Sequence, residues 1–192
     1  MFLFEIRPGV IEHPSTMASE TPVANDSPPA SQVATAKGEP SVLNFLKLSD
    51  ASAYERASYQ RVDRPAPQQD DSVVGRLRAA MNQLVKGPTP QERGQGLSSV
   101  FSPETAGLVE SIGVDQSGAA TVSLRDFREE LPSLSTSEGG VILIQLLNHT
   151  VFQFSSIDQV EYQIEGRCAT FWDFLQASGC PVITRSEFQA TP

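Results

Sequence analysis

Two short segments have the hydrophobic pattern of β-strands. The first spans residues 41–48, and its apolar residues include Val42, Phe45 and Leu46. Residues 59–64 follow as a second strand, which ends at Pro65 because proline cannot donate to a strand ladder. The pattern therefore predicts two strands ahead of the first helix.

Apolar residues at three- and four-residue spacing predict a helix from an Asp71 N-cap to about Lys86. Gly87 and Pro88 end it, since glycine tolerates the left-handed position after a helix and proline blocks continuation. Such spacing makes one buried stripe, which consists of Val73, Val74, Leu77, Ala80, Met81, Leu84 and Val85.

Three further elements follow. Apolar segments on either side of 115–118 predict a β-hairpin with Gly118 in its turn. A second helix begins near Ser135–Glu138, at a capping-box spacing, and is apolar on so many sides that it must be largely buried. Residues 159–165 then alternate as a strand whose inward residues are Val160, Tyr162 and Ile164.

The order β-β-α-β-β-α-β predicts an α/β (α+β) fold, in which two helices pack on one face of a mixed sheet. We expect one domain over residues 41–186, with a core at 41–166 and a cysteine-containing extension at 167–186. Residues 187–192 are expected to form a flexible tail. Residues 1–40 are rich in Pro, Ser and Thr and are expected to be disordered, because they cannot bury enough apolar area to offset backbone ordering.

No export signal or transmembrane segment is visible in the sequence. A secretory signal needs a basic start and an apolar stretch of roughly 7–15 residues, whereas the longest apolar run of the amino-terminal region is 1–4. No later run approaches the roughly 20 apolar residues of a membrane span. Met17 is an equally good start codon, and a signal upstream of residue 1 is the alternative.

Charge narrows the classes of partner. The chain has 14 basic and 23 acidic residues and a net charge of −9. Such a surface repels phosphate backbones and anionic membranes, so a nucleic-acid partner is not expected. No cofactor site is expected either, because the Gly94 and Gly96 pair lacks the preceding strand and the lysine of a phosphate-binding loop.

Catalytic candidates are few. The histidines are His13, in the amino-terminal region, and His149, in the second predicted helix, where a partly exposed position is favoured over a general base. The carboxylates Asp126, Glu129 and Glu130 cluster after the hairpin, and a solvated surface is favoured over acid–base chemistry. The sequence therefore predicts no catalytic site.

Cys168 and Cys180 are too far apart in sequence for a zinc-binding pair, and no histidine is nearby, so no metal site is expected. Two buried reduced thiols or one disulfide remain open. A disulfide requires an oxidising compartment, so the choice bears on where the protein resides.

The aromatic residues Phe171, Trp172 and Phe174 lie between the cysteines. A short amphipathic turn that packs on the core is favoured, and a peptide- or glycan-binding platform with Tyr162 is the alternative.

Several of these segments together resemble the GerMN domain of bacterial sporulation and spore-germination proteins. In that signature, helical leucines precede Gly-Pro-Thr, an acidic residue and Gly-Leu, as in residues 77–99. The opening strands, the hairpin, the second helix and the strand after it follow in the family's order, so the resemblance covers about 41–166. The matching positions are Arg64, Leu84, Gly87, Pro88, Thr89, Glu92, Gly96 and Leu97.

The resemblance implies an exported protein without catalytic activity, whose fold is similar to the ring-building motifs of secretion systems. It also implies packing against a protein partner or copies of itself. The sequence departs from the family by lacking a visible signal or lipobox cysteine, and its Cys168–Cys180 tail resembles an extension of a subset of members.

Three functional hypotheses follow. The leading one is a non-enzymatic, extracytoplasmic interaction module of the bacterial cell envelope. The alternative is a module that binds cell-wall glycan or peptide through Tyr162, Phe171 and Trp172. The third, and least favoured, is a small hydrolase with His149 as its base.

Overall fold

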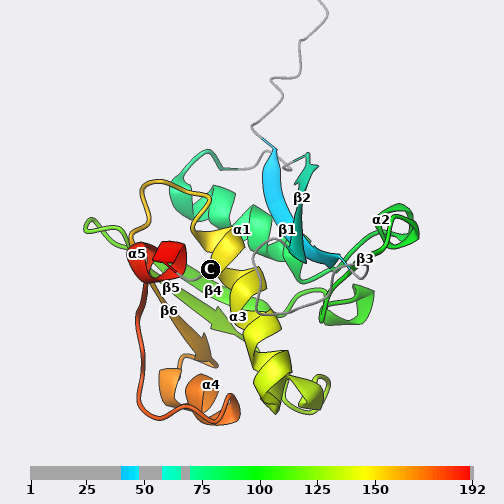
Figure 1. Cartoon of the computed structure of the whole chain (residues 1–192). Helices are drawn as coiled ribbons and strands as arrows, with labels where there is room; N and C mark the ends of the chain where they lie inside the picture. The colour runs from blue at the N-terminus through cyan, green and yellow to red at the C-terminus, as the bar shows by residue number, and fades with distance from the viewer. Residues whose placement is uncertain (1–39, 48–57, 66–69, 191–192) are drawn as a thin grey trace, which may run out of the picture. The chain divides into compact units, whose positions relative to one another are not determined.

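The computed structural model describes residues 40–47, 58–65 and 70–190, all of which belong to the unit Ala36–Pro192. These residues form helices and two β-sheets (Figure 1), which confirms the α+β class. The predicted disorder of the first 40 residues concerns positions that, apart from Pro40, lie outside the described residues. None of the described helices has the length and hydrophobicity needed to span a bilayer.

The first sheet has three strands in the order β2-β1-β3. They are β1 (Ser41–Lys47), β2 (Tyr59–Arg64) and β3 (Leu97–Ser98), and both pairings are antiparallel. The two strands predicted at this end of the chain are confirmed. The third was not predicted, because two residues are too few to show an alternating pattern.

The second sheet has the order β4-β5-β6-β7. Its strands are β4 (Val109–Val114), β5 (Ala119–Leu124), β6 (Gln159–Ile164) and β7 (Ile183–Thr184). The β4–β5 hairpin and the strand β6 are confirmed, and β6 runs parallel to β5. The strands that we placed in one mixed sheet therefore divide between two sheets, and only the second is mixed. Hydrophobic pattern identifies strands, but it does not identify their neighbours.

Two long helices connect these sheets. Helix α1 (Val73–Leu84) packs against β1, β4 and α3 (Ser137–Val151), and α3 also packs against β1. The core between them is apolar, and the side chains of Leu43, Leu77, Val122 and Leu146 are fully buried. Because α1 touches strands of both sheets, it joins them into one hydrophobic core instead of covering one face of one sheet.

Both helices begin one residue after the position that the sequence suggested. The Ser72 hydroxyl, not Asp71, caps α1 by accepting a hydrogen bond from the Gly75 N–H at 3.0 Å. The Thr136 hydroxyl caps α3 by accepting from the Gly139 N–H at 3.1 Å. Serine, threonine and aspartate are all good caps, so neighbouring candidates cannot be ranked by residue type alone.

Short elements complete the fold. They are α2 (Pro90–Gly94), η3 (Pro103–Thr105), η4 (Pro132–Ser135), α4 (Cys168–Phe174) and α5 (Arg185–Ala190). The flexible tail expected at 187–192 is wrong for residues 187–190, which belong to α5. Phe188 fixes them, because its ring packs against Phe152 and His149 and it is only 9% exposed.

Candidate functional site

Three positions that match the family signature, Gly87, Thr89 and Glu92, lie around the side chain of Arg64, at the end of β2. Its Nε donates to Oε1 of Glu92 at 3.1 Å, and one Nη pairs with Oε2 of the same carboxylate. Its other N–H groups donate to the carbonyls of Gln83 at 3.2 Å and Gly87 at 3.0 Å. The guanidinium also lies over the ring of Phe45. Arg64 thus ties β2 to the end of α1 and to α2.

Glu92 is held from the opposite side by the start of its own helix. Its Oε2 accepts from the Thr89 N–H at 2.6 Å, and the Glu92 N–H donates to the Thr89 hydroxyl at 3.3 Å, which completes a capping box. Burial alone raises the pKa of Glu92, but the hydrogen bonds from Arg64 and Thr89 and the charge of Arg64 outweigh it and lower the pKa. Glu92 is therefore ionised at neutral pH and unsuited to act as a general acid.

Gly87 and Pro88 shape the turn between α1 and α2. Gly87 has a φ of 67°, and a Cβ at this position would lie 2.1 Å from the carbonyl oxygen of Phe101. The Pro88 carbonyl accepts from Arg93. The signature leucines Leu84 and Leu97 are buried in the core on either side of this turn. The contacts of Arg64, Thr89 and Glu92 thus hold β2, the end of α1 and the start of α2 together.

The candidate aromatic platform is buried. Tyr162 and Phe171 are fully buried and Trp172 is 7% exposed, because α4 packs against β6. The Tyr162 hydroxyl donates to Oδ1 of Asn148 at 2.8 Å, and burial raises the pKa of Tyr162 well above its usual value. The prediction that these rings form an exposed contact surface is therefore wrong, and the packed amphipathic turn is correct.

His149 lies among aromatic rings. Its ring centroid is 5.4 Å from that of Tyr59 and 5.0 Å from that of Phe188. Burial raises the pKa of Tyr59 to about 12, so its phenol stays protonated at neutral pH. The ring contacts of His149 with Tyr59 and Phe188 are thus typical of packing.

The acidic group after the hairpin is solvated. Asp126 pairs with Arg128, and the hydrogen bonds from Arg128 lower the pKa of Asp126 to about 2. Both Glu129 and Glu130 are exposed. Within the described residues, no group of three or more His, Cys, Asp or Glu side chains is placed to hold a metal ion.

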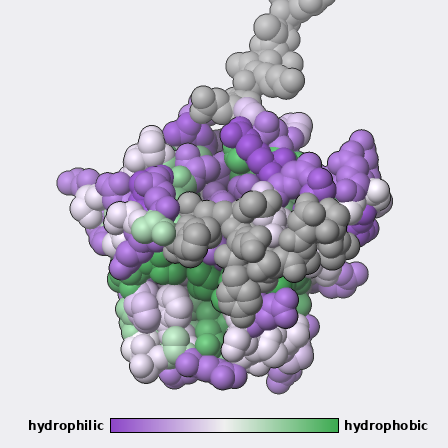
Figure 2. All heavy atoms as spheres, in the orientation of Figure 1, coloured by the Kyte–Doolittle hydropathy of each residue, from purple (hydrophilic) through white to green (hydrophobic). Residues whose placement is uncertain are grey.

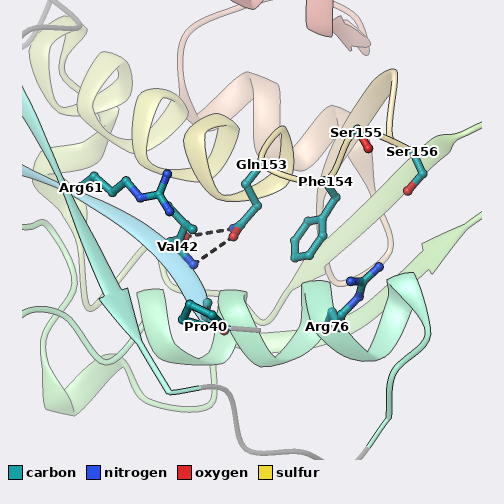
Figure 3. Close-up of a pocket in the computed structure, with 9 residues that line it drawn as sticks. Pro40, Val42, Arg61, Arg76, Gln153, Phe154, Ser155 and Ser156 are labelled. Atoms are coloured by element: carbon teal, nitrogen blue, oxygen red, sulfur yellow. Dashed lines mark hydrogen bonds between the residues drawn. The ribbon is translucent and has the colours of Figure 1, made fainter. Parts of the chain in front are cut away.

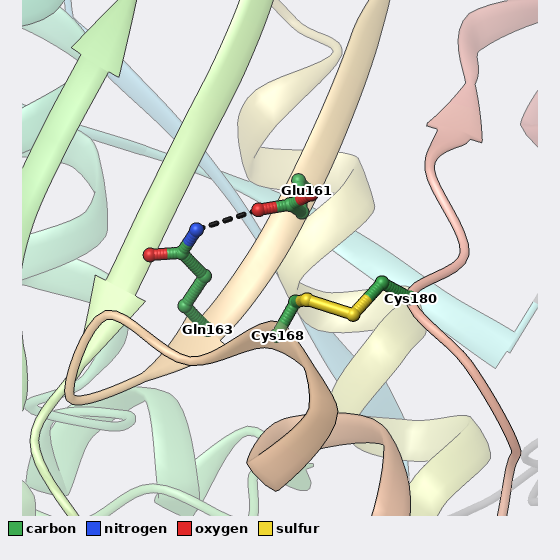
Figure 4. Close-up of a disulfide and its surroundings, with 4 residues drawn as sticks. All are labelled: Glu161, Gln163, Cys168 and Cys180. Atoms are coloured by element: carbon green, nitrogen blue, oxygen red, sulfur yellow. Dashed lines mark hydrogen bonds between the residues drawn. A yellow bond between two sulfur atoms is a disulfide. The ribbon is translucent and has the colours of Figure 1, made fainter.

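Cys168 and Cys180 form a disulfide in the structure (Figure 4). The bond links the first residue of α4 to the segment that leads to β7, and the Cα atoms are 5.4 Å apart. Beyond it, Arg185 donates to the carbonyls of Phe152 and Ile157, at the end of α3 and after it. The disulfide therefore closes a loop within the extension, and Arg185 attaches the extension to the core through charged hydrogen bonds. The role of Arg185 was missed, because no local pattern identifies a contact with a segment 28 to 33 residues away.

One pocket of about 480 Å³ lies between β1, β2, α1 and the end of α3 (Figure 3). Arg61 and Arg76 lie at its two sides, with Gln153 and Phe154 between them. The Gln153 amide accepts from the Val42 N–H and donates to the Val42 carbonyl, both at 2.9 Å. The other lining residues are Pro40, Ser41, Ser155 and Ser156, so no carboxylate is among the described lining. The sequence did not reveal this pocket, because its residues come from four separate segments.

Hydrophobic side chains also reach the surface. On the face in Figure 2, they gather between α4 and α5, beside α3. The large hydrophobic residue that is most exposed among those described is Val182, at 44%, in the segment between these helices.

Comparison with known proteins identifies the family of the chain. The model of the Germane family, described as "Sporulation and spore germination", matches residues 43–169 of the 192-residue chain. The chain belongs to the Germane family. The resemblance inferred from the signature residues is thereby confirmed, and Arg64, Gly87 and Glu92 all fall inside the matched span.

Two solved structures are similar to this Germane chain, and both are from Bacillus subtilis. The tandem GerMN domains of the sporulation protein GerM are 19% identical, with a TM-score of 0.43, and the match covers 67% of this chain and 39% of that one. The first GerMN domain of the same protein is 18% identical, with a TM-score of 0.42 and coverages of 66% and 84%. No curated protein sequence matches the chain.

Proposed function

We propose that this Germane chain is a non-catalytic interaction module of the bacterial cell envelope, which binds a protein partner or a second copy of itself. The observation that carries the proposal is the hydrogen-bond network around Arg64. The family signature positions side chains inside the fold, where Arg64 and Glu92 are bonded to each other and to backbone groups. Signature residues placed in this way support the fold and give no sign of a reaction with a substrate.

The disulfide supports a location outside the cytoplasm. Disulfides persist in oxidising compartments and are rare in the reducing cytosol. Alkylation of cell extracts before and after reduction tests this location. Cys168 and Cys180 should react only after reduction, whereas free thiols in untreated cells would contradict an extracytoplasmic location.

The interaction role is tested with the full chain. Sedimentation over a concentration series and crosslinking with envelope fractions should reveal self-association or a specific protein partner. Identification of that partner must be followed by reconstitution from purified components. A chain that stays monomeric at all concentrations and forms no reconstituted complex would refute the proposal.

The pocket at Arg76 favours a second candidate function, the binding of a carboxylate-bearing cell-wall peptide. Its volume is within the range of small-ligand sites. The guanidinium of Arg76 is suited to a carboxylate, whereas that of Arg61 already pairs with Asp63 at 2.9 Å, and Phe154 offers an apolar surface. Calorimetric titration with an acidic muramyl peptide should show binding that Arg76→Gln weakens and Arg167→Gln, at an exposed site elsewhere, does not. Equal affinities for the two variants would exclude this site.

A further inference from the structure

The outer edge of β2 is open within the described part of the chain. In the first sheet, β2 pairs with β1 on one side, and no described strand pairs with it on the other. Its sequence from Gln60 to Asp63 is Gln-Arg-Val-Asp, and the side chains of Arg61 and Asp63 are 64% and 52% exposed. Arg61 Nε pairs with Asp63 Oδ1 along the strand at 2.9 Å, so these residues present an exposed backbone edge and one charge of each sign at the surface.

The hydrogen bonds of Val42 determine which backbone groups of β2 point outward. In an antiparallel ladder, the N–H and C=O of one residue point to the same side. Both groups of Val42 bond to Gln153 and therefore point away from β2. Since Val42 is paired with Asp63, the N–H and C=O of Asp63 point away from β1. Those of Arg61, two residues earlier, do the same.

The charges on this edge are complementary to those of a second copy in one register. If two β2 strands pair antiparallel about Val62, Arg61 of each strand lies opposite Asp63 of the other. This register also places the outward backbone groups of Arg61 and Asp63 opposite each other, as a hydrogen-bonded pair requires. Shifts by two residues instead place Arg61 opposite Arg61, or Asp63 opposite Asp63, and such like-charge pairs are destabilising.

We propose that the β2 edges of two chains pair antiparallel about Val62 and form a symmetric dimer. The inference specifies the surface for the self-association in the proposed function and rests on it. Charged residues on an edge strand commonly prevent edge-to-edge pairing. Here the opposite signs of Arg61 and Asp63 disfavour the two registers shifted by two residues and favour the one centred on Val62. The short strand gives a small interface, so the dimer is weak and depends on concentration.

Charge reversal provides the test, with the full oxidised chain in analytical ultracentrifugation. Arg61→Asp and Asp63→Arg each place like charges opposite each other, and each should weaken self-association about tenfold or more. A mixture of the two variants restores both opposite-charge pairs and should form a heterodimer at least as well as the wild type. The double variant, with both charges exchanged, should also recover. The exposed control Arg167→Asp should associate like the wild type.

Crosslinking tests the register directly. Val62→Cys places two cysteines at the symmetry axis, in a non-hydrogen-bonded pair whose Cα atoms are about 4.5 Å apart, within reach of a disulfide. The control Gln60→Cys lies on the same face of the strand, but its two copies are roughly 14 Å apart along the ladder. Mild oxidation should therefore crosslink the first variant and not the second.

The outcomes separate this inference from the proposed function. If the wild type self-associates and neither charge reversal affects it, another surface is responsible, and the proposed function stands without the β2 edge. If the wild type stays monomeric and Val62→Cys does not crosslink, the dimer is refuted, and the proposed function depends on a different protein partner.

Discussion

Removal of the Arg64 guanidinium should destabilise the fold more than removal of any exposed arginine. Arg64→Met keeps an apolar stem against Phe45 but leaves Glu92 without its charged partner, and the side chains of Arg64 and Glu92 are only 10% and 12% exposed. The carbonyls of Gln83 and Gly87 also lose their donor. Removing one partner of a buried ion pair lowers the free energy of unfolding by about 3–5 kcal/mol. Some water reaches this pair, so we expect a loss near the lower end, about 3 kcal/mol.

The effect should also depend on pH. The folded-state pKa of Glu92 is lowered, so its ionised form stabilises the fold fully above the unfolded-state pKa, near 4.5. That contribution is lost as the pH falls through the lower folded-state pKa. Arg64→Met removes the principal partner that lowers the pKa, so its destabilisation should be largest at pH 6–7 and should shrink towards pH 3.

Urea denaturation of both proteins from pH 3 to 7 measures this difference, with Arg167→Met as the exposed control. The reasoning would be refuted if Arg64→Met cost no more than the control at pH 7. A difference between wild type and Arg64→Met that stayed constant with pH would show that packing on Phe45, and not the ion pair, carries the effect.

Three other perturbations address the turn and the extension, and thermal or urea denaturation measures each. Gly87→Ala should lose roughly 2–4 kcal/mol, because the new Cβ meets the Phe101 carbonyl at a positive φ, whereas Gly94→Ala, with open space around it, should be tolerated. Cys168→Ser should lower the free energy of unfolding by about 3 kcal/mol, because it opens the loop that the disulfide closes over a sequence separation of 12. The reduced wild type should show the same loss. Arg185→Gln should lose about 1.5–3 kcal/mol, since it breaks charged hydrogen bonds to the Phe152 and Ile157 carbonyls.

Local pattern was sufficient for much of this fold. The stripe on α1, the β4–β5 hairpin and the alternation in β6 are repeated signals over six or more residues, and each predicted an element that the structure contains. The division into two sheets was not predictable in this way. It depends on which strands pair, and β1 pairs with β2 and with β3, some 50 positions later in the sequence, while β4 to β7 pair among themselves.

The same distinction applies to the candidate site. The motif around Gly87 was visible because its members are close in sequence, although its partner Arg64 was linked to it only through the resemblance. The alternation in β6 predicted an inward Tyr162, but burial of Trp172 was harder to predict, since aromatic residues serve equally in cores and at binding surfaces. The pocket between Arg61 and Arg76 required the three-dimensional structure, because it joins strand, helix and loop segments that share no sequence pattern.

The hydrogen bonds of Arg64 and Gln153 affect how tightly such a module binds. Association is weakened when surfaces must become ordered as they meet, so a rigid edge binds more tightly than a flexible one with the same contacts. Arg64 holds the end of β2 against α1 and α2, and Gln153 holds the start of β1 against the end of α3. Both contacts fix the sheet whose outer strand carries Arg61 and Asp63. A loosened Arg64→Met variant should therefore associate more weakly than the wild type even at temperatures where it remains folded, although Arg64 itself lies outside the proposed contact.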